Sequence, residues 1–347
     1  MALAPAPLFL VSTHTDDEGI LVYRLADGDG HLELLHQYRE IVNPFFIGLH
    51  PNGRVLYSIS TPDHVAALSL DRSSGELELI NTQPTQGGPC YVEVDPSGRM
   101  AVAANYTDGS VISYPLGKDG ALGKPASFVQ HVGHSVHWRR QTEPHAHCIK
   151  VSGDGRFAFA ADLGTDRINI YALDPAAGRL SPGEQRFARV PPESGPRHFT
   201  FSPDHRHGYV INEIGNTITA FAYDAERGLL LERDTVPTLP ADFDGESGTA
   251  DLAFTPDGRF LYGTNRGHDS IAMFKVDADS GVLSSNGFEP SRGEMPQNLT
   301  MTPDGKLLFV TNTKGNRVVA FHIEEDSGKL EFSCETEMPA PGCAVLG

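Results

Sequence analysis

The amino-acid sequence predicts an all-β fold, a seven-bladed β-propeller whose ring is closed by strands from both ends of the chain. Three observations support this prediction. A turn motif occurs six times, each repeat divides into four β-rich runs, and an incomplete set of runs near the N-terminus is completed by residues 341–347. We expect one propeller domain over residues 1–347 and no helix of any length.

The turn motif places Pro, Asp, Ser or Asn beside Gly between two β-rich runs, which is typical of a β-hairpin. Its copies are HPNGRVLY from His50, DPSGRMAV from Asp95, SGDGRFAF from Ser152, SPDHRHGYV from Ser202, TPDGRFLY from Thr255 and TPDGKLLF from Thr302. The turn glycines lie 45 to 57 residues apart, with His205 taking the place of the glycine in the fourth copy. A repeat of this length that contains only strands predicts a propeller blade.

Each repeat divides into four strands, and the division is clearest in residues 196–236, which read PRHFTF, HGYVIN, ITAFAYD and LLLERDTV. The six turns predict six blades. Residues 8–36 match the second, third and fourth strands of another blade that has no first strand. The segment PGCAVLG at 341–347 resembles GPCYVEV at 88–94, so we expect it to complete this blade and to remove the exposed edges of an open ring.

The composition excludes several classes of protein. A formal net charge of −18 argues against a nucleic-acid partner, and an anionic small molecule would need local arginines. The four cysteines form no CxxC pair and predict no disulfide framework. The N-terminal MALAPAPLFLVST has no basic residue and only a short apolar run, and no segment approaches eighteen apolar residues. We therefore expect a cytoplasmic protein without a membrane partner, whose oligomeric state the sequence does not specify.

Propeller geometry predicts which residues meet. The first strand of each blade lies nearest the axis, so its start shares one face of the ring with the turn between the second and third strands. The first position of these strands reads Phe45, Cys90, His147, Arg197, Ala250 and Gln297, and the next reads Phe46, Tyr91, Cys148, His198, Asp251 and Asn298. The turns on the same face read Asn105-Tyr106, Asp162-Leu163-Gly164, Asn212-Glu213, Asn265-Arg266 and Asn312-Thr313.

Blades four to seven are therefore expected to bring an imidazole, two guanidinium groups, a carboxylate and two amides to one mouth of the channel. These residues are His147, Arg197, Glu213, Arg266, Gln297 and Asn298. Blades two and three contribute mostly aromatic residues. Such a pocket suits an anionic, oxygen-rich small molecule. Structural alternatives exist: Asn105 and Asn312 would only hold their turns, Glu213 and Arg266 would form a surface ion pair, and His147 would be a satisfied strand-edge imidazole.

A histidine-rich segment occupies the longest spacing between blades. It contains His131, His134, His137, His145 and His147. HxxH and HxH spacings can bind zinc, but an extended loop gives the ligands no fixed face. We expect instead a loop that folds over the mouth of the channel, and we predict no metal and no cofactor. Within this segment His147 is the first candidate for the site, His145 the second, and Glu143 belongs to the loop.

Several motifs resemble those of the propeller-type lactonase family, which contains 6-phosphogluconolactonases and the related fungal carboxymuconate cyclases. They are RQTEPHAHC at 140–148, ADLGTDRINIY at 161–171, GPRHFTFSPD at 195–204, YVINEIGNTI at 209–218 and MPQNLTMTPDGKLLFVTN at 295–312. The resemblance runs over the whole chain. In the cyclase branch it implies a histidine, two arginines and a glutamate as active groups, which match His147, Arg197, Glu213 and Arg266. The second blade departs from the family pattern with HPNG and YSIS, so a contact from that blade is not implied.

The resemblance implies hydrolysis of a sugar lactone, first of all 6-phosphogluconolactone, as a step of the pentose phosphate pathway. His147 or Glu213 would act as general base on a water, one arginine would stabilise the oxyanion and the other would hold the phosphate. No GxSxG motif is present, so a covalent acyl-enzyme is not expected. The expected substrate-binding residues are His145, His198, Asn212, Gln297, Asn298, Tyr91 and Tyr106. The alternatives are a muconate-type cycloisomerase that lactonises a dicarboxylate, and a non-enzymatic propeller that binds a partner protein.

Overall fold

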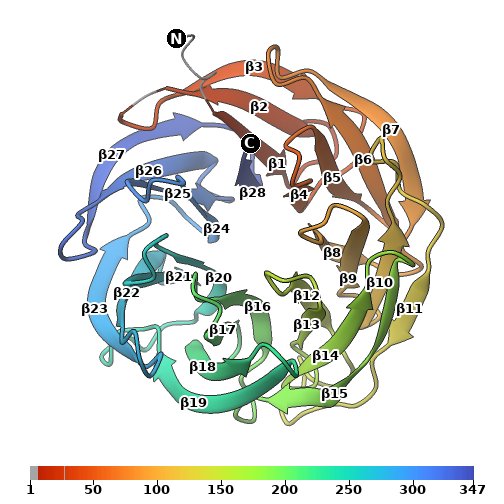
Figure 1. The fold of residues 1–347 in the computed structure, drawn as a ribbon. Helices are drawn as coiled ribbons and strands as arrows, with labels where there is room; N and C mark the ends of the chain where they lie inside the picture. The colour runs from red at the N-terminus through yellow and green to blue at the C-terminus, as the bar shows by residue number, and fades with distance from the viewer. Residues whose placement is uncertain (1–6, 27) are drawn as a thin grey trace.

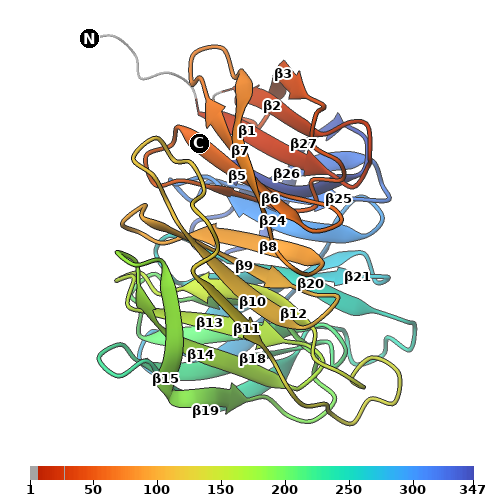
Figure 2. The same cartoon turned by 90° about the vertical axis from the view of Figure 1, so that its right-hand side faces the viewer.

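A computed structural model describes residues 7–26 and 28–347. Every regular element in these residues is a β-strand, and the strands form seven four-stranded antiparallel sheets. The sheets are arranged as blades around a common axis (Figure 1). In the view turned by 90° the strands run between the two faces of the ring (Figure 2). The seven-bladed propeller predicted from the repeat is confirmed.

The strands of each blade are given from the axis outward. The first three blades contain β28 (Pro341–Leu346), β1 (Leu8–Thr13), β2 (Ile20–Leu25) and β3 (Leu32–Tyr38); β4 (Ile47–Leu49), β5 (Val55–Ser60), β6 (His64–Leu70) and β7 (Leu77–Pro84); and β8 (Pro89–Val94), β9 (Met100–Asn105), β10 (Ser110–Pro115) and β11 (Ser127–Gln130). The fourth and fifth contain β12 (Ala146–Val151), β13 (Phe157–Asp162), β14 (Arg167–Asp174) and β15 (Arg179–Arg189); and β16 (Pro196–Phe201), β17 (His207–Asn212), β18 (Thr217–Asp224) and β19 (Leu229–Pro237). The sixth and seventh contain β20 (Gly248–Phe254), β21 (Phe260–Arg266), β22 (Ser270–Val276) and β23 (Leu283–Pro290); and β24 (Pro296–Met301), β25 (Leu307–Asn312), β26 (Arg317–Ile323) and β27 (Leu330–Glu337).

The ring closes as predicted. Strand β28 pairs antiparallel with β1, so that Leu10 lies opposite Val345. The amide of Gly347 donates to the carbonyl of Leu8 at 2.8 Å, and the amide of Leu8 donates back at 3.1 Å. The innermost strand of the first blade therefore comes from the opposite end of the chain, and no blade is left with an open inner edge.

The repeated turn joins the first and second strands in six of the seven blades and requires a left-handed residue. Gly258 has φ of +74° there, and His205 adopts φ of +56° in the copy without glycine. The hydroxyl of Thr255 donates to Asp257 at 2.6 Å, and the same carboxylate accepts the amide of Arg259 at 3.0 Å. The Thr-Pro-Asp-Gly sequence thus supplies both the backbone conformation and the side-chain bonds of a tight hairpin.

The core lies between neighbouring blades. Strands β9, β17 and β25 are buried at every residue, whereas the outermost strands alternate between buried and exposed positions. Buried tyrosines on the second strands join adjacent blades through their hydroxyls, because each donates to a glycine carbonyl of the next blade. The pairs are Tyr57 with Gly120 at 2.7 Å, Tyr209 with Gly281 at 2.8 Å and Tyr262 with Gly328 at 2.9 Å. A buried phenol is stable there because its polar end is satisfied.

The structure bears on the expectations about membrane spans, disulfides and the N-terminal segment. None of the described residues forms a helix that is long and apolar enough to cross a membrane. All four cysteines are free thiols, and Cys90, Cys148 and Cys343 are buried. Residues 1–6, which belong to the segment that argues against a signal peptide, lie outside the described residues.

Candidate active site

In several blades a β-bulge near the start of the innermost strand takes one residue out of the ladder. In β12 the register passes from Ala146 opposite Asp162 to Cys148 opposite Ala161, which leaves His147 outside the ladder. The same shift frees Arg197 in β16 and Gln297 in β24. Because a bulged residue leaves the alternation of the strand, its side chain can be re-aimed. Four residues of the first predicted column, Cys90, His147, Arg197 and Gln297, are therefore bulged residues. Phe45 precedes β4, and Ala250 lies in a wider irregularity that also includes Asp251.

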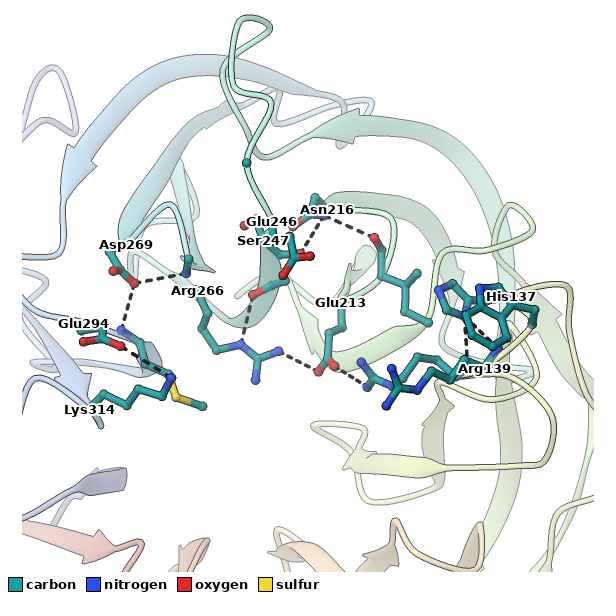
Figure 3. Close-up of a pocket in the computed structure, with 17 residues that line it drawn as sticks. His137, Arg139, Glu213, Asn216, Glu246, Ser247, Arg266, Asp269, Glu294 and Lys314 are labelled. Carbon is teal, nitrogen blue, oxygen red and sulfur yellow. Dashed lines mark hydrogen bonds and ion pairs between the residues drawn. The ribbon is translucent and has the colours of Figure 1, made fainter.

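The carboxylate of Glu213 is the centre of the site. It follows β17 and forms ion pairs with three guanidinium groups. Its Oε2 lies 2.8 Å from Nη2 of Arg266 and 3.1 Å from Nε of Arg197, and its Oε1 lies 2.6 Å from Nη2 of Arg140. Figure 3 shows Glu213 between Arg266 and the loop that carries Arg139. The predicted meeting of Arg197, Glu213 and Arg266 at one mouth is thus seen in the structure.

The charged groups of this cluster shift the pKa values of one another because they are buried and poorly solvated. Arg197 is 1 % exposed, and burial together with the nearby charge of Arg266 lowers its pKa to about 10. Burial alone would raise the pKa of Glu213, but the charges of Arg266 and Arg197 hold it far below its usual value. Both groups are therefore ionised at neutral pH, and each oxygen of the carboxylate is already engaged by a guanidinium group.

His147 is a neutral imidazole beside these charges. It is 6 % exposed, and its Nδ1 lies 4.0 Å from Sγ of Cys90. Its ring packs edge-on against Tyr106 and His198 at centroid distances of 5.3 and 5.4 Å. Burial lowers the pKa of His147 well below its ordinary value, and the charge of Arg197 opposes protonation further. At neutral pH the ring can therefore accept a proton.

Arg140 joins the cluster and was not among the predicted site residues. Besides Glu213 it contacts the phenol of Tyr106, to which its Nη2 donates at 3.2 Å. It lies in the inter-blade loop, outside the repeat whose columns predicted the other residues. Two signals in the sequence pointed to it: the basic run Trp138-Arg139-Arg140 and its position at the start of the RQTEPHAHC motif.

Residues 137–140 of the histidine-rich loop line the mouth cavity, and hydrogen bonds of its other histidines hold the loop in place. His131 bonds Asp162 through Nδ1 at 2.6 Å and the hydroxyl of Tyr171 through Nε2 at 2.8 Å. The Nδ1 of His145 bonds the carbonyl of Tyr106 at 2.9 Å, and the two rings stack. Among the described residues no group of three or more His, Cys, Asp or Glu side chains is placed to hold a metal ion.

His14 is a second residue that the prediction missed. It follows β1 in the turn that corresponds to Asn212-Glu213 and Asn265-Arg266, and the column of turns above had begun only at the third blade. Its ring packs edge-on against Phe45 at 4.1 Å, and its buried Nε2 has no hydrogen-bond partner among the described residues. Burial lowers the pKa of His14 to about 4, with a contribution from the charge of Arg197.

Two cavities border the residues described above. The mouth cavity has a volume of about 1220 Å³, and its lining includes His137, Arg139, Arg140, Glu213, Arg266 and Lys314. A second cavity of about 300 Å³ lies farther along the channel and is lined by Tyr91, Glu93, Lys150, His198, Asp251 and Asn298, among others. Phe45, Arg197 and Gln297 line a narrow gap of about 10 Å³ that also touches His198 and Asn298.

None of the seven expected substrate-binding residues lines the mouth cavity, although Tyr106 contacts Arg140 and Gln297 lines the narrow gap beside Arg197. Their role in binding stays a prediction. His198 bonds Asp251 at 2.8 Å, Asn298 bonds the same carboxylate at 2.6 Å, and the phenol of Tyr91 donates to Glu93 at 3.0 Å. These three line the second cavity because the residue after each bulge returns to the ladder. Asn212 is fully buried, and its amide donates to Thr217 and Thr219, so it holds its turn. Asn105 and Asn312 bond neighbouring backbone carbonyls in the same way.

The comparisons with known proteins agree with this geometry. Residues 8–346 match the model of the family described as lactonase, 7-bladed β-propeller. The chain is 35 % identical over 295 residues to a 6-phosphogluconolactonase of Bacillus subtilis, with 83 % of each chain covered. It is 33 % identical over 307 residues to a 6-phosphogluconolactonase of Formosa agariphila, with 83 % of this chain and 84 % of the relative covered.

A solved structure of a related protein has the same fold as this chain. The periplasmic gluconolactonase of Pseudomonas aeruginosa superposes with a TM-score of 0.92 at 31 % identity, over 98 % of both chains. The family model, the two relatives and this structure each cover most of the chain. The chain therefore belongs to the seven-bladed β-propeller lactonase family.

Proposed function

We propose that this protein hydrolyses a sugar lactone, with 6-phosphogluconolactone as the favoured substrate and 6-phosphogluconate as the product. The observation on which this proposal rests is the cluster of three guanidinium groups around Glu213, with the neutral imidazole of His147 nearby. The relatives named 6-phosphogluconolactonase and the structure named gluconolactonase support the class of substrate. The convergence of charges on one face counts against a propeller that only binds a partner protein.

In the proposed reaction His147 removes a proton from a water molecule whose oxygen attacks the lactone carbonyl carbon. The carbonyl oxygen becomes an oxyanion, which the guanidinium groups of Arg197 and Arg266 would stabilise because Glu213 holds them in place before the reaction. The bond between the carbonyl carbon and the ring oxygen then breaks. The imidazolium of His147 returns its proton to the leaving oxygen, so the step is balanced by water alone.

Glu213 is the weaker of the two candidates for the general base. A general base needs a lone pair that is free to accept a proton from the attacking water. Both oxygens of Glu213 are bonded to guanidinium groups, and their charges hold its pKa far below the usual range. We therefore assign it the role of orienting the arginines, and we assign the proton transfer to His147.

A substrate panel tests the proposed function. The wild-type protein is expected to hydrolyse 6-phosphogluconolactone and glucono-δ-lactone above the spontaneous rate, and to leave cis,cis-muconate and 3-carboxymuconate unchanged. Lactone hydrolysis is followed by acid release and muconate loss by ultraviolet absorbance. Turnover of a muconate without lactone hydrolysis would favour the cycloisomerase, in which two arginines bind two carboxylates. Absence of turnover in every assay would refute an enzymatic role for these substrates.

The pH dependence of the reaction tests the general base. The active form of His147 is the neutral imidazole, so activity is complete above its pKa and is lost as the pH falls through it. Burial and Arg197 lower this pKa well below 6.5, so we expect the acidic limb of kcat/KM to lie below pH 6.5. Glucono-δ-lactone is the substrate of choice, because a phosphate titrates near pH 6 and would distort the profile. An acidic limb at or above pH 6.5 would contradict this assignment.

The location in the cell stays a prediction. A cytoplasmic location would fit a phosphorylated lactone of the pentose phosphate pathway as the substrate. The similar gluconolactonase of Pseudomonas aeruginosa, in contrast, is named periplasmic. Cell fractionation with an antibody against the protein distinguishes the two compartments.

A further inference from the structure

The mouth cavity has two ends of different charge. Figure 3 shows His137 and Arg139 at one end, Asp269 and Glu294 at the other, and Glu213 and Arg266 between them. Arg139 and Arg140 both line the first end. At the second end the only lysine, Lys314, lies 3.5 Å from Glu294 and is therefore already paired. An anionic group of the substrate is attracted to the loop end and repelled from the end formed by Asp269 and Glu294.

The three arginines around Glu213 differ in the donors they leave for a ligand. Arg197 is almost fully buried, and its Nε and Nη1 are bonded to Glu213 and to the carbonyl of Ala250. Arg266 uses Nε and Nη2 for the carbonyls of Gly248 and Thr249. The side chain of Arg140 is 41 % exposed and bonds its protein partners through Nη2 alone. Its Nε and Nη1 have no hydrogen-bond partner among the described residues, so each can donate a charge-assisted hydrogen bond to an anionic oxygen.

The loop presents Arg140 from a fixed turn. The Nδ1 of His137 accepts the amides of Arg139 at 3.3 Å and Arg140 at 3.0 Å. The fully buried amide of Gln141 donates to Asp166 at 2.7 Å and to the carbonyl of Leu163 at 2.9 Å. These bonds fix the backbone on both sides of Arg140 before any ligand arrives. Less conformational entropy is then lost on binding, which favours affinity.

We propose that Arg140 binds the phosphate group of the substrate and so makes this site selective for phosphorylated sugar lactones. The inference rests on the proposed lactonase function and names the residue that recognises the phosphate, which neither Arg197 nor Arg266 is placed to do as well. The sugar hydroxyls then lie toward Asp269 and Glu294, whose carboxylates can accept their hydrogen bonds. A phosphate carries a charge of about −1.5 to −2 at pH 7, so the guanidinium groups of Arg139 and Arg140 favour its binding at the loop end although the chain as a whole is acidic.

Kinetics of Arg140→Ala with two lactones test the proposal. We expect the ratio of kcat/KM for 6-phosphogluconolactone to that for glucono-δ-lactone to fall at least about tenfold, the loss typical of one charge-assisted contact. The ratio cancels any effect of Arg140 on Glu213, because that effect applies to both substrates. Lys314→Ala is the matched control: it removes one positive charge from the same cavity at the opposite end, and the ratio should change less than about threefold. An equal loss for both lactones in Arg140→Ala would overturn the proposal.

A binding measurement separates this inference from the proposed function. Calorimetry is expected to give a Kd for 6-phosphogluconate at least about tenfold lower than for gluconate in the wild type, and no such difference in Arg140→Ala. Trp138 is the only tryptophan, lies two residues before Arg140 and is 81 % exposed, so its fluorescence should respond to 6-phosphogluconate. Equal affinities in the wild type would overturn the inference even if lactones are hydrolysed. Arg140-dependent binding without lactone hydrolysis would refute the proposed function and leave the phosphate site standing.

Discussion

Glu213→Gln is expected to lower the free energy of unfolding by about 3–5 kcal/mol and to reduce kcat/KM by about a hundredfold. The substitution keeps the shape of the side chain and removes its charge. It leaves Arg197, which is 1 % exposed, beside the like charge of Arg266 without a counter-ion. The arginines then lose the anchor that orients them. Urea denaturation followed by circular dichroism measures the stability, and lactone hydrolysis measures the activity.

Glu184→Gln provides the matched control for this effect. Glu184 pairs with Arg227 on the surface, where both side chains are more than half exposed. An exposed ion pair of this kind contributes little to stability, so stability and activity should stay near the wild-type values. If Glu213→Gln behaved like Glu184→Gln, the cluster would not be the desolvated centre of the site.

His147→Ala is expected to reduce kcat/KM for lactones at least tenfold, and about 10²- to 10⁴-fold if the imidazole transfers a proton in the transition state. The loss should appear mainly in kcat, because the ring is not among the residues that line the mouth cavity and contributes little to ground-state binding. Arg197→Ala is expected to lose at least tenfold as well, with an additional loss of stability because Glu213 then lacks one of its partners. Steady-state kinetics on glucono-δ-lactone give both values.

The control for His147 is another histidine of the same loop. His134 is exposed, and its side chain makes one hydrogen bond among the described residues, from Nδ1 to the carbonyl of Ser135 at 3.3 Å. His134→Ala should therefore keep wild-type rates. Wild-type kinetics in both His147→Ala and Arg197→Ala would exclude this site from catalysis. A loss in Arg197→Ala alone would leave the electrostatic cluster in place and move the general base to another group.

The propeller could be predicted from the sequence because the blades share the same turn motif between β-rich runs. The turn needs a left-handed residue and a short polar side chain, and these requirements recur even where His205 replaces glycine. The completing strand β28 could be predicted from its likeness to residues 88–94 because both occupy the same place in a blade. Local requirements that repeat leave a visible period in the sequence.

Only those site residues that occupy equivalent positions of the repeat could be predicted from the sequence. His147 and Arg197 occupy the bulge, and Glu213 and Arg266 occupy the turn, so alignment of the blades brings them together. The second column failed because His198 pairs with Ile211 and faces farther along the channel. Arg140 is placed by the bonds of Gln141 to Asp166, which depend on the three-dimensional contact of a loop with a distant turn. No spacing in the sequence records such a contact.

The pairing of β28 with β1 has a consequence for how the chain folds during synthesis. Ser12 and Cys343, which bond each other across this pair, lie 331 positions apart. At about 5–20 residues per second, translation of the intervening segment takes roughly 15–65 s. During that time β1 leaves the ribosome without its inner neighbour, and its edge is open to other chains. A nascent chain that stops before β28 would keep this edge, which marks it for chaperones and proteases.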